Sequence, residues 1–584
     1  MPESPNLARQ QFRVLHRQFL FRMVDLELLS AHAQGDTSKL LGQLAALLVF
    51  FGVMFSIAIV GVAGGRVPRE VLLVRAWGLE HSLIATTMLV VGLFAVLSWE
   101  SVFPDRRDVL VLTPLPVRAE TLFLTKASAA VSALGVSVIA LNALPGLALP
   151  FALAPPGRNV LEFLIQPALY RALVSFWITV CAAGAFIYCS VLSVQGLASL
   201  ILSRRYFLRV SAILQMAAFC LFVSVYFLQP SLTTPRTLAA PENQSLLAWL
   251  PSYWFLGLFQ ELNGSAHRAF DPLARRAWIG LVLVGSGAVA AFLLSYFRTL
   301  RKIVEEPDIV PGSRVARWSP RLGNSLAAAV LLFSVRTLLR SRQHRVLLSF
   351  FWGIGLAIVI GYVKSPSAQM QVVEGSATAQ YQVSVPLLMS SLVMMCLAVA
   401  GTRIVFSMPL ELPANWIFRV MPDRRTPEYV PAIRRSLLIL GVAPVWTGSV
   451  VLFLSIWPWW PAAGHLMLLG LAGVVFAELC LNGFQKIPFT CSYLPGKSNV
   501  HLVFLVFVML LIPLIGGVAR LEQRALGDPA GFALMVSILG ILAICARWRT
   551  AALAKSPGAV LQFEEVPRPE VQTLELRRDG VFPV

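Results

Sequence analysis

Long apolar stretches separated by short polar segments run along almost the whole chain. A helix needs about 20 mostly apolar residues to cross the hydrocarbon core of a bilayer. By this criterion the sequence predicts about twelve membrane-spanning helices, at residues 41–63, 81–99, 127–152, 172–201, 207–228, 277–297, 347–363, 385–406, 436–457, 464–483, 500–518 and 529–546. The predicted fold class is therefore an all-α polytopic integral membrane protein.

The longest polar interruption, residues 298–346, carries ten basic residues and separates two groups of six spans. Each group opens with a segment, 10–29 or 325–346, that mixes apolar and basic residues at helical spacing. Such segments are typical of helices lying on the inner membrane surface. The predicted domains are a first six-span half (1–300), a basic cytoplasmic linker (301–346), a second six-span half (347–550) and a cytoplasmic tail (551–584).

Prolines and glutamines recur at matching places in the two halves. The loop after the second span has Pro104 and Pro114 in the first half, and Pro413 and Pro422 in the second. The fourth span of each half closes with a glutamine, at Gln195 and Gln485. These recurring residues predict an internal duplication, an arrangement common among transporters.

Composition excludes a soluble enzyme. Hydrophobic residues make up 57% and charged residues 13%, against roughly 45–50% and 25% in soluble domains, and the mean hydropathy is +0.73. The net charge of +19 comes from basic residues between the apolar runs, which indicates topology and contact with anionic lipid rather than nucleic-acid binding. Roughly three times as many Lys and Arg fall on the side of the N-terminus as on the other, so both termini are predicted to be cytoplasmic.

No cofactor or metal site is predicted in this chain. Residues 495–498 (PGKS) resemble the end of a phosphate-binding loop, but Cys491 stands where the loop requires its first glycine. The seven cysteines lie in or beside apolar runs and form no CxxC pair.

Two stretches resemble the six-span permeases of ATP-binding-cassette (ABC) exporters, whose ATPase is a separate polypeptide. The first is Phe103–Lys126, FPDRRDVLVLTPLPVRAETLFLTK, and the second is Leu250–Gly264, LPSYWFLGLFQELNG. The resemblance implies an ATPase-coupling loop in the first stretch, with Asp105, Arg106, Arg107, Asp108, Leu110, Pro114, Pro116 and Arg118 as its site residues. In the second stretch, Pro251, Trp254 and Phe255 are expected either in an outer gate segment or in an interfacial helix with aromatic anchors.

By this resemblance the chain is the membrane-spanning subunit of an exporter in a bacterial inner membrane, with ATP bound by partner subunits. The loop after the eighth span reads LPANWIFRVMPDRRTPEY, and the last outer loop (519–528) is too short to hold a counterpart of LPSYWF. The second half thus departs from the family pattern. The residues do not specify the transported substrate.

Polar residues inside the spans keep other function classes open. Ionisable groups in a membrane are costly and usually face a partner or a cavity. Glu478 is expected to touch substrate, pair with Lys486 or contact a neighbouring helix, and Asn142, Gln195 and Gln485 are expected to form interhelical polar contacts. The alternatives are an ion-coupled secondary transporter and a membrane-embedded transferase.

Overall fold

The computed structural model divides the chain into two compact units. Unit 1 comprises Met1–Arg317 with Leu356–Gly361, and unit 2 comprises Trp318–Gly355 with Tyr362–Val584. The residues that the structure describes are 5–24, 37–63, 69–103, 108–109, 112, 114–115, 117–154, 159–230, 232, 234–265, 267–305, 325–363, 371–372, 381–408, 426–482, 484, 486–490, 500–556 and 561.

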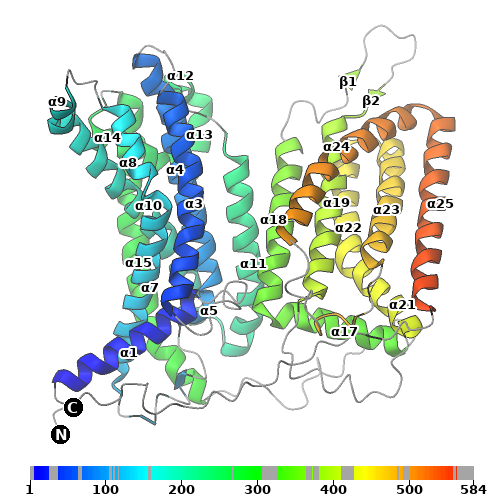
Figure 1. The fold of residues 1–584 in the computed structure, drawn as a ribbon, viewed down its shortest axis with the longest axis horizontal. Helices are drawn as coiled ribbons and strands as arrows, with labels where there is room; N and C mark the ends of the chain where they lie inside the picture. The colour runs from blue at the N-terminus through cyan, green and yellow to red at the C-terminus, as the bar shows by residue number, and fades with distance from the viewer. Residues whose placement is uncertain are drawn as a thin grey trace. The chain divides into compact units, whose positions relative to one another are not determined.

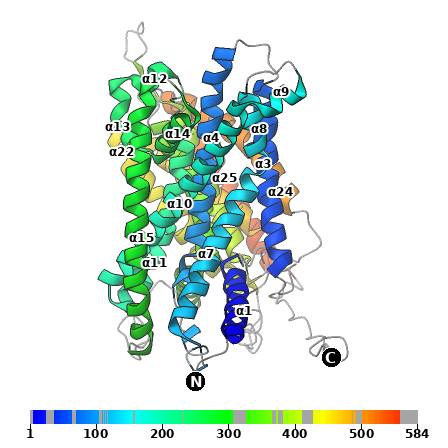
Figure 2. The ribbon, with the colours of Figure 1, turned by 90° about the vertical axis from the view of Figure 1, so that its left-hand side faces the viewer.

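Unit 1 is a bundle of long helices with short helices at its ends. In chain order they are α1 (Pro5–Val24), α3 (Thr37–Ala63), α4 (Arg69–Leu97), α5 (Trp99–Val102), α7 (Ala119–Asn142), α8 (Pro145–Leu153), α9 (Val160–Ile165), α10 (Pro167–Ile201), α11 (Arg204–Leu228), α12 (Pro235–Ala239), α13 (Pro241–Trp249), α14 (Pro251–Asn263), a 3-10 turn (Arg268–Phe270) and α15 (Asp271–Glu305). The helix α1 lies at one end of this bundle and α14 lies towards the other, and the long helices run between them (Figures 1 and 2).

Unit 2 is also built mainly from long helices. Its elements are α17 (Ser325–Arg340), α18 (Arg342–Val363, except Leu356–Gly361, which belong to unit 1), β1 (Gln371–Val372), β2 (Tyr381–Gln382), α19 (Val385–Phe406), α21 (Thr426–Leu437), a π-helical turn (Leu438–Val442), α22 (Ala443–Ile456), α23 (Trp459–Leu481), α24 (Val500–Gly527) and α25 (Pro529–Ala554). The helix α17 lies across one end of the long helices (Figure 1). The two-residue strands pair antiparallel, with Gln371 opposite Gln382, and the sequence did not predict them.

Ten helical segments are long and apolar enough to cross a membrane, among the residues the structure describes. All ten coincide with predicted spans. The other two predicted spans also fall on helices: 207–228 on α11, whose apolar part Ile213–Leu228 is shorter, and 500–518 on α24. The chain is thus a polytopic α-helical membrane protein with ten candidate spans, and the predicted number of twelve additionally requires α11 and α24.

The third span of each unit is interrupted next to a proline. In unit 1, α7 ends at Asn142 and α8 begins at Pro145, which matches the break predicted from Pro145 and Pro150. In unit 2, the π-helical turn Leu438–Val442 comes directly before Pro444. Proline has no N–H to donate to the preceding turn, so a break or a π-bulge absorbs the missing bond.

The predicted outer loop at 519–528 is wrong. The helix α24 continues through it to Gly527, and Asp528 caps α25 by accepting hydrogen bonds from the backbone N–H groups of Ala530 and Gly531. A short polar stretch with Arg520, Glu522 and Arg524 resembles a loop in sequence. Here it extends the helix because its inward residues, Ala519, Glu522 and Ala525, are buried.

Four pairs of helices pack together in the same way inside each unit. In unit 1, α1 packs on α7, α4 on α10 and α11, and α10 on α15. In unit 2, α17 packs on α21, α19 on α23 and α24, and α23 on α25. These four pairings recur in the same order, as an internal duplication would produce, whereas α3 on α7 in unit 1 and α24 on α25 in unit 2 are not matched among the described residues.

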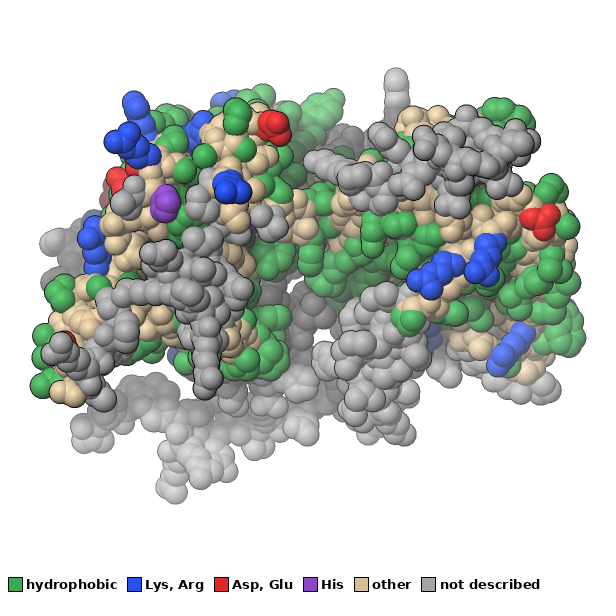
Figure 3. Space-filling view, turned by 90° about the horizontal axis from the view of Figure 1, so that it is seen from above, with side chains coloured by type: hydrophobic (Ala, Val, Ile, Leu, Met, Phe, Trp, Pro, Cys, Tyr) green, Lys and Arg blue, Asp and Glu red, His purple; other side chains and the backbone are tan. Residues whose placement is uncertain are grey.

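Apolar side chains cover the outer flanks of the bundles. Val131 and Ile139 of α7 are 68% and 57% exposed, and the apolar segment of α25 has no buried residue. Viewed from above, charged side chains are scattered among apolar ones, with no single charged patch in the part of the surface that the described residues cover (Figure 3). Lipid is the natural solvent for such flanks.

Candidate functional site

The segment between α4 and α7 is fixed to the rest of unit 1 at its start. Trp99 of α5 is 1% exposed, and its indole Nε1 donates a hydrogen bond to the Ser211 hydroxyl of α11 at 2.7 Å. The side-chain amide of Gln195, near the end of α10, donates to the Trp99 carbonyl. Two long helices therefore hold the point at which the chain leaves the second span.

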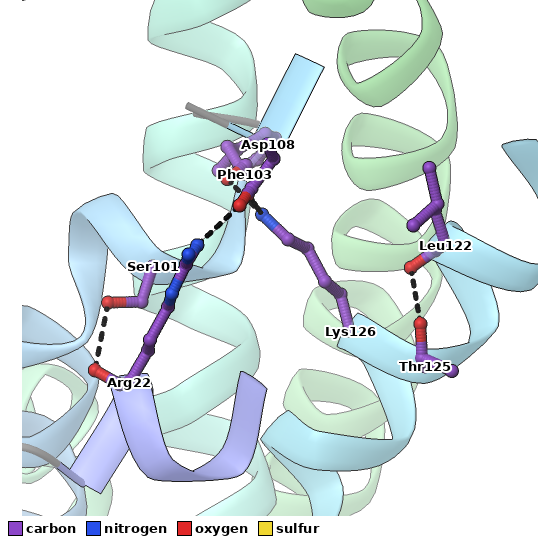
Figure 4. Close-up of polar contacts among 7 residues, drawn as sticks. All are labelled: Arg22, Ser101, Phe103, Asp108, Leu122, Thr125 and Lys126. Carbon is purple, nitrogen blue, oxygen red and sulfur yellow. Dashed lines mark hydrogen bonds and ion pairs between the residues drawn. The ribbon is translucent and has the colours of Figure 1, made fainter. Parts of the chain in front are cut away.

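Asp108 lies at the centre of a buried ion cluster that holds this segment further along. Its carboxylate accepts hydrogen bonds from the Lys126 ammonium, at 2.6 Å, and from the Arg22 guanidinium (Figure 4). Lys126 also donates to the Phe103 carbonyl at 2.8 Å, and its ammonium lies 5.0 Å from the centre of the Phe19 ring. Arg22 and Phe19 belong to α1 and Lys126 to α7, so the cluster joins three segments that are distant in sequence.

The charges in this cluster are well matched. The exposed fractions of Lys126 and Asp108 are 2% and 7%. Burial alone would raise the pKa of the Asp108 carboxyl, but the Lys126 ammonium and the Arg22 guanidinium more than offset that effect, and the pKa lies below its usual value. The carboxylate is therefore ionised at neutral pH, and each buried charge has a partner, as burial requires.

The predicted coupling-loop residues separate into three groups. Asp105, Arg106, Arg107, Leu110 and Pro116 lie outside the described residues. Pro114 and Arg118 are exposed, and Leu115 between them is 50% exposed.

Asp108 and Val109 are buried instead. We expected Asp108 to form ion pairs with a partner protein, and this expectation needs correction, because its carboxylate binds Arg22 and Lys126 inside unit 1. The exposed part of the loop is thus its proline-containing turn.

The helix α14, which contains the second resemblance, is an internal element of unit 1. All of its residues from Ser252 to Gln260 except Trp254 are buried. It packs against α4, α10 and α15, Phe255 is fully buried, and the Trp254 indole donates to the Leu247 carbonyl at 2.9 Å. Pro251 begins the helix and Gly264, with φ of +81°, ends it.

A polar network that the sequence analysis missed joins α14 to the start of α4. The Gln260 side-chain amide donates to the Glu80 carboxylate, and His81 lies 3.1 Å from the Ser252 hydroxyl with its ring stacked on Tyr253. Glu80 is 2% exposed and His81 6%. The signal in the sequence was a Glu-His pair at the boundary of the predicted second span, with Glu80 just before it and His81 its first residue.

The predicted intramembrane polar residues form contacts between helices. Asn142 of α7 exchanges hydrogen bonds with Thr87 of α4, at 3.0 and 3.3 Å. Gln195 binds the Trp99 carbonyl as described above, and Gln485 lies outside the described residues.

Glu478 of α23 is held by two other helices of unit 2. Its carboxylate pairs with the Arg434 guanidinium of α21 and accepts a hydrogen bond from the Thr550 hydroxyl of α25 at 2.8 Å. The side chain is 2% exposed. The ion-pair partner of Glu478 is therefore Arg434 and not Lys486, which was one of the expected partners.

Comparison with known proteins gives no match: none of the protein-family models, curated proteins or solved structures searched is similar to this chain.

Proposed function

We propose that this protein is the membrane-spanning permease subunit of an ABC exporter, driven by ATP that a separate subunit hydrolyses. The proposal rests on the two sequence resemblances and on the all-helical membrane architecture. Each unit provides one permease half, and the substrate remains to be identified.

The observation that carries the proposal is the buried Asp108 cluster. An ATPase that changes shape can move a permease only through a segment that does not yield locally. The cluster links the loop before α7 to α1 and α7 through two charge-assisted hydrogen bonds, and such bonds are about twice as strong as neutral ones. A push on this loop would therefore reach the third span directly.

The contact surface for the ATPase is the exposed turn of this loop, with Pro114, Leu115 and Arg118. Pro114 restricts the backbone, and Leu115 offers an apolar side chain outside the membrane spans, where an exposed apolar group favours a protein partner. Asp108 lies beneath the surface and acts as the anchor of the turn.

The test is purification of the tagged full-length protein in mild detergent, with and without a non-hydrolysable ATP analogue, followed by mass spectrometry. An ATPase subunit with a complete phosphate-binding loop should co-purify in a nucleotide-dependent manner. Leu115→Asp should reduce its recovery about tenfold, equivalent to about 1.4 kcal/mol. The matched control is Arg268→Ala, an exposed change at the other end of unit 1.

Two results would count against this function. One is the absence of any ATPase under conditions that preserve membrane complexes. The other is recovery that is unchanged by Leu115→Asp, which would exclude this turn as the contact surface. An absent ATPase would favour the ion-coupled secondary transporter.

A further inference from the structure

Three buried polar residues of unit 2 lie in a row near the end opposite Glu478. His465 of α23 lies with Nε2 at 2.9 Å from the Ser391 hydroxyl of α19 and with Nδ1 at 2.6 Å from the Glu522 carboxylate of α24. Their exposed fractions are 0% for His465, 1% for Glu522 and 3% for Ser391. Three helices thus contribute one polar group each to a network closed to solvent.

The order Ser–His–Glu is also that of a hydrolytic triad, but the surroundings do not suit hydrolysis. Ser391 lies well inside α19, where backbone N–H groups bond within the helix and offer no oxyanion hole. The near-complete burial of all three side chains also leaves no room for a substrate at the hydroxyl. The network therefore needs another explanation than nucleophilic catalysis.

The hydrogens of this network can be placed in two ways. The Ser391 hydroxyl has two acceptors within reach, the Leu388 carbonyl at 2.8 Å and His465 Nε2 at 2.9 Å. If the hydroxyl donates to the Leu388 carbonyl, Nε2 of His465 must carry a hydrogen that it donates to the Ser391 oxygen. The short contact between Nδ1 of His465 and the Glu522 carboxylate then contains a second hydrogen. If the hydroxyl donates to Nε2, the network contains one proton fewer, with His465 neutral and Glu522 ionised.

In both arrangements the Ser391–His465 contact and the His465–Glu522 contact each join one donor to one acceptor, and the arrangements differ by one proton and the rotation of one hydroxyl hydrogen. A buried group usually resists a change of charge because one of its states lacks partners. In this network both protonation states keep the Ser391–His465 and His465–Glu522 contacts. We propose that the Ser391–His465–Glu522 network is a proton-binding site, and this proposal is independent of the proposed exporter function.

The environment makes the loss of this proton consequential. The rings of Phe453 and Trp457 lie 4.3 and 6.2 Å from the His465 ring, which gives the site apolar walls. On the packed elements at this end, the other charged side chains that the structure describes are Arg520, Arg524 and Asp528, all exposed. Without the proton, Glu522 leaves a net negative charge among apolar helices.

The segment that would respond is the end of α24. Glu522 belongs to it, and the neighbouring Gln523 side chain donates to the Val383 carbonyl before α19 at 2.7 Å. These two contacts dock the last turns of α24 onto α23 and onto the chain entering α19. Proton release weakens the first of them, because the contact between His465 Nδ1 and Glu522 changes from one between opposite charges to a hydrogen bond donated by a neutral imidazole. This site thus couples proton binding to the docking of α24.

Infrared difference spectroscopy on the full-length protein in lipid nanodiscs, titrated from pH ~4 to ~9, tests the site. The expected result is a titrating buried carboxyl and imidazole signal that Glu522→Gln and His465→Gln each abolish. Asp528→Asn, which removes the exposed carboxylate six residues away, should leave this signal unchanged. Ser391→Ala should shift the midpoint without removing the signal, because it deletes the alternative donor and retains the pair.

A second measurement guards against variants that fail to fold. Wild-type protein with isotope-labelled histidine should show, by nuclear magnetic resonance, one buried ring that changes its protonation state over the same pH range. If no buried imidazole titrates in the wild-type protein, or if the infrared signal survives Glu522→Gln, the site does not exchange a proton and the proposal is overturned.

Discussion

At the scale of single residues, the Lys126 ammonium lies among three groups from two segments: the Asp108 carboxylate and the Phe103 carbonyl of the loop, and the face of the Phe19 ring of α1. Because it is 2% exposed, water cannot replace it. Its removal would leave a buried carboxylate held only by Arg22, whose side chain is 43% exposed. Among the described residues of this cluster, Lys126 is thus the one whose loss has the clearest physical cost.

Lys126→Met should destabilise the protein by about 3–5 kcal/mol, the cost of leaving one member of a buried ion pair without its partner. The double variant Lys126→Met with Asp108→Asn should be less destabilised than the sum of the two single variants, because it removes both charges. Thermal unfolding in nanodiscs measures the three free energies, and Glu120→Gln on the exposed side of α7 is the control. Additive effects would mean that the two side chains do not interact.

The lowered pKa of Asp108 makes its contribution to stability depend on pH. Since the folded state binds the proton less tightly than the unfolded state, the contribution is present above the unfolded pKa, near 3.8, and is lost as the pH falls through the lower folded pKa. Wild-type protein should therefore be more stable than Asp108→Asn at neutral pH, and this difference in stability should disappear in acid. Unfolding temperatures of both proteins, measured from neutral pH down to about pH 3, test this, and a constant difference would contradict it.

The sequence singled out Asp108 and Glu478, but it did not predict the contacts that their side chains make. Asp108 was predicted to lie at the surface of a coupling loop, because a carboxylate in a charged run resembles a surface group. Its inward direction depends on Lys126, 18 residues later. Glu478 was identified as a costly buried acid, while its partner Arg434 lies 44 residues away. Such pairings depend on helix packing, which the chain pattern does not contain.

At the scale of elements, α14 fits tightly against the start of α15. A Cβ added at Gly257 would lie 2.6 Å from the Leu273 Cβ and 2.8 Å from the Ala274 backbone nitrogen. Only a residue without a side chain permits this approach. The close contact explains why a short apolar helix that reads as a surface segment is buried in the bundle.

Gly257→Ala should therefore destabilise unit 1 by about 1–3 kcal/mol through overpacking. Gly285→Ala in α15 is the matched control, since nothing lies within 4 Å of a Cβ there and alanine favours the helix. Thermal unfolding in nanodiscs compares them. Equal stability of the two variants would show that α14 is not packed as described.

Helix boundaries were predictable where a local sequence feature, such as a proline or a long apolar run, determines them. Pro145 predicted the break in the third span, and ten apolar runs predicted the ten candidate spans. The end of α24 was not predictable, because Arg520, Glu522 and Arg524 make the segment look like a loop. Its helical state follows from the burial of one face, including Glu522 against His465.

At the scale of the whole molecule, the orientation in the membrane is a prediction from the distribution of Lys and Arg. It places the turn with Leu115 in the cytoplasm and Arg268 on the opposite side. A membrane-impermeant maleimide should label Leu115→Cys only in inverted vesicles and Arg268→Cys only in intact cells. The parent protein gives the background from its own cysteines, and the reverse pattern would invert the topology.

The two units share four helix pairings and differ at the end where α14 lies in unit 1. There, unit 1 has a separate short helix fixed by Gln260 and Glu80, and unit 2 has the last turns of α24 fixed by Glu522 and His465. A duplication followed by divergence accounts for both the likeness and the difference.

In the proposed function, an ATPase subunit binds the turn that the Asp108 cluster supports. The most direct test is a photo-crosslinking amino acid at Leu115 in native membranes, with the same group at Arg268 as the control, followed by mass spectrometry of the adducts. We expect an adduct with an ATPase subunit at Leu115 alone. Crosslinks to lipid only, or the same partners at both positions, would overturn the proposed contact.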